Sequence, residues 1–157
     1  MSRTLSLKIP GFDTPMNLPA DRINEGVLLA FNHGQCHALA LALHELTGLP
    51  LRLEVSRDIL ALLRLTPEKL LDLTSVPNYA IARYWSHALV LLGPDQYLDV
   101  SGVSSRPHSP LTTHFIVPTT PDQILALSRV YRSGDAPNLE VARHFAPLVL
   151  REYEINY

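Results

Sequence analysis

Three residues of this 157-residue chain combine reactive chemistry with suggestive positions: Cys36, His87 and Asp99. Cys36 is the single cysteine, and it follows Gly34 and Gln35 at the start of a run of helix-forming residues. A thiol at a helix N-terminus feels the helix dipole and the unpaired backbone N–H groups, which stabilise the thiolate. The same N–H groups can hold the oxyanion formed when a thiolate attacks a carbonyl. Cys36 is therefore a candidate nucleophile.

His87 and Asp99 belong to a predicted hairpin. Its parts are two short strand-like runs, 87–92 and 97–100, and the four turn residues 93–96 between them. A histidine facing the thiol can act as base and then as acid, and a carboxylate on its second ring nitrogen fixes the tautomer. A tight turn places Asp99 near Val90, roughly 10 Å short of facing His87. A bulge, a strand stagger or a bend is then needed to join them.

Two neighbours of these residues are candidates for the walls of a substrate cleft. Gly34, just before the candidate nucleophile, lets backbone or substrate approach closely. Trp85 lies two residues before His87. Taken alone, Trp85 is most simply interpreted as a core residue. The second interpretation is that it forms a wall of the cleft.

The elements that must position these residues follow from the hydrophobic patterns. The first half predicts an edge strand or arm at 5–9, a helical turn or two within 20–31, a helix over 36–46 stopped by Gly48 and Pro50, and a strand over 51–55. Next come a short helical segment at 59–65, a helix from 66 to about 73, and an apolar run into the next strand at 79–85. After the hairpin we expect a Ser/Pro loop at 102–113, a strand at 114–117, and helices at 120–131 and 138–154, the last bent or restarted at Pro147. This pattern predicts an α+β fold, with a central helix packed on an antiparallel sheet and additional C-terminal helices.

The composition excludes several classes of protein. A hydrophobic content of 46% with a net charge of -2 argues against disorder, and a single cysteine excludes a disulfide within the chain. Thirteen Lys and Arg against fifteen Asp and Glu offer nucleic acid no bulk attraction. No apolar run approaches the roughly 20 residues of a membrane span, and the N-terminus lacks the apolar region of a signal peptide. We expect a cytoplasmic protein, or one secreted without a signal peptide as an effector.

The order Cys, His, Asp on a helix and two successive strands resembles the papain-like, transglutaminase-like superfamily of cysteine enzymes. The matching segments are Gly-Gln-Cys-His-Ala-Leu-Ala at 34–40, Ser-His-Ala-Leu-Val at 86–90 and Tyr-Leu-Asp-Val-Ser-Gly at 97–102. The resemblance covers roughly residues 30–103. It looks closest to the small bacterial papain-like toxin and effector domains, which act as proteases or deamidases. The larger signatures of arylamine N-acetyltransferases and peptidoglycan peptidases are absent.

The resemblance implies a papain-like core and a cysteine hydrolase or acyl transferase acting on an amide, of protease, deamidase or transglutaminase type. It implies a thioester on Cys36, and an oxyanion side chain at Gln35 or Asn32. No cofactor is needed, and a protein or peptide amide is the substrate, with a cognate inhibitor or immunity protein as a further partner. The expected organisation is one domain over 1–157, comprising an N-terminal arm and helix at 1–29, a core at about 30–117 and C-terminal helices at 118–157.

Two other hypotheses stay open at this point. One is a catalytically silent papain-like fold that serves as a binding or accessory protein; an intact Cys-His-Asp set argues against it. The other is a metal site built from the thiol and three histidines: His33, Cys36, His37 and His87. The metal hypothesis is weaker, because adjacent residues on a helix point in different directions and no carboxylate flanks them at metal-motif spacing.

Overall fold

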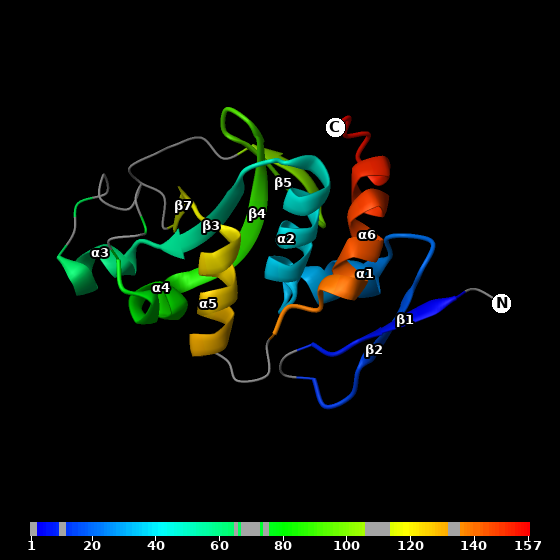
Figure 1. Ribbon diagram of the computed structural model, residues 1–157, viewed down its shortest axis with the longest axis horizontal. Helices are drawn as coiled ribbons and strands as arrows, with labels where there is room; N and C mark the ends of the chain where they lie inside the picture. The colour runs from blue at the N-terminus through cyan, green and yellow to red at the C-terminus, as the bar shows by residue number, and fades with distance from the viewer. Residues whose placement is uncertain are drawn as a thin grey trace.

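Figure 1 shows a computed structural model of the chain, which describes residues 3–9, 12–64, 66, 73, 76–105, 114–131 and 136–157. Within these ranges the fold is mixed α+β: six helices accompany a five-stranded antiparallel sheet and a separate two-stranded sheet. The helices are α1 (Glu25–Asn32), α2 (Cys36–Thr47), α3 (Asp58–Leu63), α4 (Asn78–Tyr84), α5 (Pro121–Tyr131) and α6 (Leu139–Glu152). The strands are β1 (Thr4–Leu7), β2 (Met16–Pro19), β3 (Leu51–Ser56), β4 (Trp85–Gly93), β5 (Gln96–Asp99), β6 (Gly102–Ser105) and β7 (His114–Pro118).

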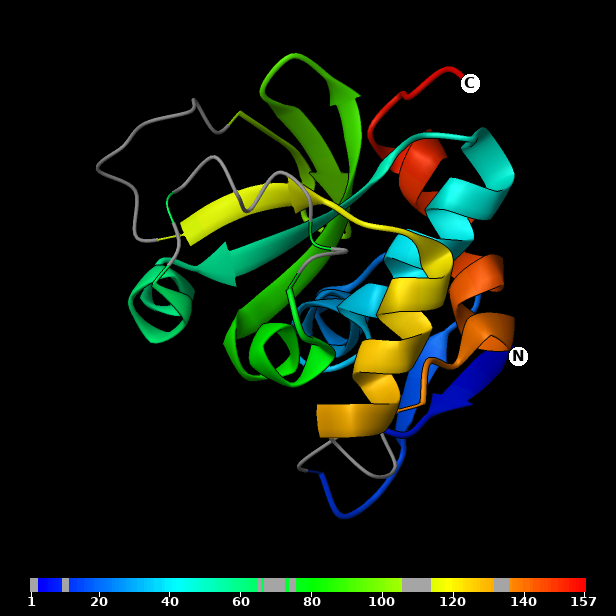
Figure 2. The same cartoon turned by 60° about the vertical axis from the view of Figure 1, so that its left-hand side comes forward.

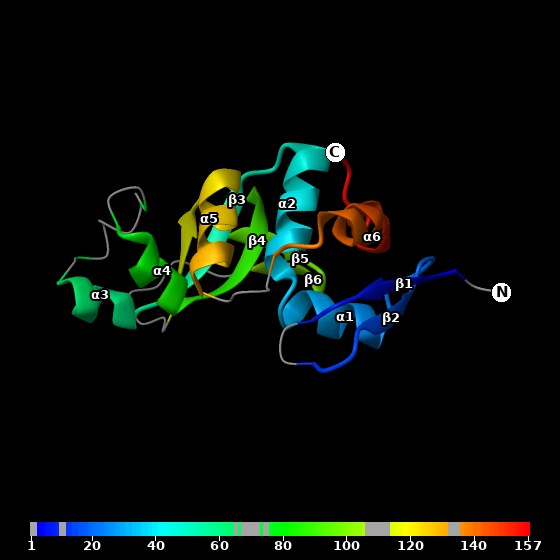
Figure 3. The ribbon, with the colours of Figure 1, turned by 60° about the horizontal axis from the view of Figure 1, so that its bottom comes forward.

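The five-stranded sheet has the order β6-β5-β4-β3-β7, so the hairpin strands β4 and β5 lie side by side near its middle. Successive side chains of β3 alternate between the two faces of the sheet as expected, and Leu51, Leu53 and Val55 on one face are buried. The separate pair β1–β2 lies beside α1 and α6, away from the large sheet (Figure 3). On the other flank of the molecule α4 and α5 pack against each other (Figure 2).

Helix α2 is the centre of the fold. It packs against β4 on one side and against α6 on the other (Figure 1). Its first eight residues, Cys36 to Leu43, are all buried, which fits a helix of alternating alanine and leucine with contacts on every side. The helix ends where the sequence predicts, because Gly48 adopts the left-handed conformation with φ 74°.

Side-chain caps define the starts of three other helices. Asn24 accepts a hydrogen bond from the Val27 N–H at α1, and Asn138 does the same for Val141 at α6. At α5 the Thr120 hydroxyl accepts from the backbone N–H of Gln123.

Two expectations about elements are wrong. Residues 78–84 form helix α4 rather than an extended run into β4, because short apolar runs have no periodicity that separates strand from helix. Residues 102–105 are strand β6, not loop. Helix α6 continues through Pro147, so of the two alternatives expected there, a bend or a restart, the restart is excluded. Most of the helix expected from 66 to about 73, and the loop residues 106–113, lie outside the described residues.

Among the residues that the structure describes, no helix is both long and apolar enough to cross a bilayer.

The turn between β5 and β6 is held against the C-terminal end of α6. The Tyr153 hydroxyl donates to the Val100 carbonyl at 2.9 Å. The Tyr153 ring lies against Gly102, whose φ of 107° suits glycine. A Cβ on Gly102 would lie 2.8 Å from a ring carbon of Tyr153.

Gly102→Ala should therefore lower the free energy of unfolding by about 1–3 kcal/mol, from backbone strain and from displacement of the tyrosine ring. Gly93→Ala is the matched control, because a Cβ there meets nothing within 4 Å, and its effect should stay within about 0.5 kcal/mol. Urea unfolding of the three proteins measures both values. Equal stability of the two variants would show that Tyr153 does not constrain the turn.

Candidate functional site

Cys36, His87 and Asp99 meet at one place in the fold. Cys36 is the first residue of α2, His87 lies near the start of β4, and Asp99 is the last residue of β5. His87 Nε2 donates to Asp99 Oδ2 at 2.9 Å, and the imidazole also hydrogen-bonds the Cys36 thiol. Because Nε2 is already bonded to the carboxylate, Nδ1 is the ring nitrogen left to hydrogen-bond the thiol.

The link between His87 and Asp99 depends on a bulge in the β4–β5 hairpin. Gly93 pairs with Gln96 across the two-residue turn, as a regular hairpin requires. The next pair is Leu91 with Tyr97, so the register shifts by one residue at Leu92.

The bulge decides which face of the sheet carries the carboxylate. Without it, Asp99 would pair with Val90, as the sequence alone suggests, and would point to the face opposite His87. With it, Val90 pairs with Leu98, and the same register places Asp99 opposite Leu89. Residues two apart share a face, so Asp99 and His87 become diagonal neighbours on one face. The 2.9 Å bond spans this diagonal.

The surroundings of Cys36 favour the thiolate. Burial raises the pKa of this thiol, which is 6% exposed. Hydrogen bonds from His37 and His87, and the positive charge that each imidazole can carry, outweigh burial and lower the pKa from an ordinary 9.0 to about 6. The thiol is therefore mostly ionised at neutral pH.

The surroundings of His87 favour its cation. Burial lowers the pKa of the imidazole, but hydrogen bonds to Asp99 and Cys36 and the negative charges of both groups raise it from 6.5 to about 10. Between about pH 6 and pH 10 the pair is a thiolate and an imidazolium, flanked by a carboxylate. A pair in this state can supply a nucleophile and a general acid side by side.

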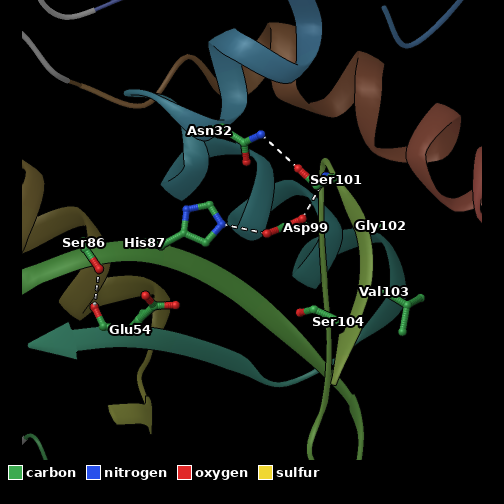
Figure 4. A pocket seen from close by; sticks show the side chains of 9 residues that line it. All are labelled: Asn32, Glu54, Ser86, His87, Asp99, Ser101, Gly102, Val103 and Ser104. Carbon is green, nitrogen blue, oxygen red and sulfur yellow. Dashed lines mark hydrogen bonds and ion pairs between the residues drawn. The ribbon is translucent and has the colours of Figure 1, made fainter. Parts of the chain in front are cut away.

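A pocket of about 410 Å³ opens in front of His87 and Asp99 (Figure 4). Its walls come from α1, from the strands β3, β4, β5 and β6, and from the β5–β6 turn. The lining residues are Asn32, Glu54, Ser86, His87, Asp99, Ser101, Gly102, Val103 and Ser104. Most of them carry groups that hydrogen-bond, so the pocket suits a polar part of a substrate.

The two side chains expected to hold an oxyanion lie in different places. Asn32 lines the pocket and donates through Nδ2 to the Ser101 hydroxyl at 2.9 Å. Gln35 is 3% exposed and bonds backbone groups outside the pocket lining. Its Nε2 donates to the Lys8 carbonyl at 3.4 Å and its Oε1 accepts from Asn138 N–H at 3.0 Å. The structure thus gives Gln35 a part in joining the N-terminal arm to α6.

The two residues expected to wall the cleft are not among those that line the pocket. Gly34 has a φ of 147° in the turn that leads into α2. Trp85 packs edge-on against His37, with ring centroids 6.0 Å apart, which supports the simpler interpretation of Trp85 as a core residue.

Several residues of the site were not expected. His37 is 2% exposed and hydrogen-bonds the thiol, although the sequence suggested it only as a metal ligand. Glu54 pairs with His87 across the β3–β4 ladder and lines the pocket. Its place on the wet face of β3 was visible in the alternation of 51–55, but its neighbour on β4 was not. Ser101 lies two residues after Asp99, and nothing in the sequence pattern marked it as part of the site.

Within the described part of the chain, no three His, Cys, Asp or Glu side chains come together in a way that could hold a metal ion. His33, one of the four residues of the metal hypothesis, is exposed.

Comparison of the chain with protein-family models, with curated proteins and with solved structures gives no match.

Proposed function

We propose that this chain is a cysteine-dependent hydrolase or acyl transferase that acts on an amide through a thioester on Cys36, and that its α+β core is papain-like. The observation that carries the proposal is the continuous set of hydrogen bonds from Cys36 through His87 to Asp99. A charged set of which Cys36 is buried and His87 and Asp99 are partly buried costs desolvation energy, and perturbed pKa values of this kind cluster at functional sites.

The reaction follows from the two protonation states. The Cys36 thiolate attacks the amide carbon, forming the C–S bond and an oxyanion, which the backbone N–H groups at the start of α2 hold. The imidazolium of His87 gives its proton to the amide nitrogen, the C–N bond breaks, and the amine leaves a thioester. Neutral His87 then takes a proton from water or from an acceptor amine, which attacks the thioester and releases Cys36 as thiolate. Asp99 holds the ring throughout.

The proposal covers three reaction types, which share this acyl-enzyme. A protease releases a peptide amine, a deamidase releases ammonia, and a transglutaminase resolves the thioester with an amine. The resemblance to small bacterial papain-like domains favours a toxin or effector acting on a protein substrate. The polar lining of the pocket, including Asn32 and Ser104, agrees with an amide or amine entering there.

The competing hypothesis is a catalytically silent fold used for binding. Such a protein has no need of a thiol that ionises near pH 6. The two hypotheses differ in the reactivity of Cys36, because an ordinary buried thiol is alkylated slowly at neutral pH.

Cys36→Ala should abolish covalent capture and turnover while the protein stays folded. Alanine favours helix and the change removes one small buried atom, so the free energy of unfolding should change by about 1 kcal/mol. The measurement is intact mass after incubation with an electrophilic peptide amide analogue, with circular dichroism as the check on folding. An adduct on the wild type that persists in the alanine variant would place the chemistry elsewhere.

The pH dependence of alkylation tests the ion pair directly. Cys36 is the only thiol, and the thiolate fraction grows as pH rises through its pKa, so the iodoacetamide rate should rise with a midpoint near pH 6. His87→Ala removes a hydrogen bond and a cation, so the midpoint should move towards 9.0. Asp99→Asn should move it less, because the carboxylate acts on the sulfur only through the ring, yet turnover should fall.

His33→Ala is the matched control for this series, since His33 lies three residues before Cys36 on the exposed surface. Its alkylation profile should match that of the wild type. A His87→Ala profile that also matches the wild type would refute His87 as the partner of the thiol.

A further inference from the structure

Asp99 is held by a second hydrogen bond behind its contact with His87. Its Oδ2 accepts from His87 Nε2 at 2.9 Å, and its Oδ1 accepts from the backbone N–H of Ser101 at 2.8 Å. Two bonds to different oxygens fix the plane of the carboxylate, and hydrogen bonds to an ionised group are among the stronger ones. The orientation of the carboxylate therefore depends on the position of Ser101.

Ser101 is in turn held by Asn32. The Asn32 amide donates through Nδ2 to the Ser101 hydroxyl at 2.9 Å, and both residues line the pocket (Figure 4). Asn32 is the last residue of α1, four residues before Cys36. This bond therefore connects the segment that leads to the nucleophile with the turn that follows the carboxylate.

We propose that Ser101 and Asn32 are positioning residues, which hold the Asp99 carboxylate and through it the His87 ring in line with Cys36. The inference rests on the proposed function, since positioning has a purpose only if His87 serves the thiol. The set links side chains from α1, the β5–β6 turn, β5 and β4 through one backbone N–H, that of Ser101. Its distances are 2.9, 2.8 and 2.9 Å.

Loss of either side chain has a defined physical consequence. Without the Asn32 bond the turn loses its side-chain link to α1, so Ser101 gains freedom and its N–H leaves the carboxylate part of the time. A carboxylate that turns away stabilises the imidazolium less. The pKa of His87 then falls towards that of an ordinary histidine.

Asn32 was also a candidate for the oxyanion role, and the two roles differ in what they predict. An oxyanion donor meets the substrate only and leaves the titration of His87 in the free protein unchanged. A positioning residue changes that titration without substrate. If the two residues act through one bond, the double variant should also shift the His87 titration no further than each single variant does.

The experiment is NMR titration of ¹⁵N-histidine-labelled protein, with the His87 signals assigned from His87→Gln. The series comprises Asn32→Ala, Ser101→Ala and the double variant, with Asp99→Asn as the reference for complete loss. In both single variants the His87 midpoint should fall by about 0.5–1 pH unit, and the double variant should show the same fall. Ser101→Thr keeps the hydroxyl and should restore the wild-type value.

Two controls and three outcomes make the test decisive. Asn17→Ala and Ser105→Ala remove the same groups from exposed positions outside the pocket lining and should leave the titration unchanged. A raised wild-type midpoint that is unmoved by Asn32→Ala and Ser101→Ala would overturn the positioning role alone. Shifts that add in the double variant would show that the two residues act separately, which also overturns it. A wild-type midpoint near 6.5 would instead overturn the proposed function.

Discussion

The burial of α2 is the constraint on which the rest of the structure depends. Its alanines and leucines from Ala38 to Leu43 pack between β4 and α6, and each fully buried leucine contributes about 1.5–3 kcal/mol. Because interiors are close-packed, the helix cannot slide or turn without opening cavities on two sides. Cys36, as its first residue, is therefore placed by the core itself.

His87 and Asp99 come together beside this thiol because of the β-bulge in the β4–β5 hairpin. A regular β4–β5 hairpin would put Asp99 on the wrong face, and the single extra residue at Leu92 reverses that. The β5–β6 turn then holds the carboxylate from behind, with Ser101 and Tyr153 on its two sides. The site thus combines the start of a closely packed helix with a hairpin whose register is shifted by one residue.

The charges of the site balance one another in a buried place. A thiolate alone would carry a large desolvation cost at 6% exposure, and the partly buried imidazolium would carry a desolvation cost as well. Side by side, with Asp99 behind the ring, each lowers the cost of the other, which is why the pKa values of Cys36 and His87 move in opposite directions. His37 adds a further hydrogen bond to the sulfur, which makes the state of the thiol depend on two imidazoles.

Local residue pattern by itself determined α2 with its Gly48 stop, the alternation of β3 and the β4–β5 hairpin, because each depends on near neighbours in the chain. It also singled out Cys36, His87 and Asp99 as candidates for a shared site. It mistook α4 for an extended run, since a short apolar run has no period to measure. Only the tertiary structure decided the bulge and the buried contacts of Gln35. The Asn32–Ser101 bond, between residues 69 apart, also came from it alone. Register and long-range pairing depend on how whole elements pack, and local pattern carries no record of that.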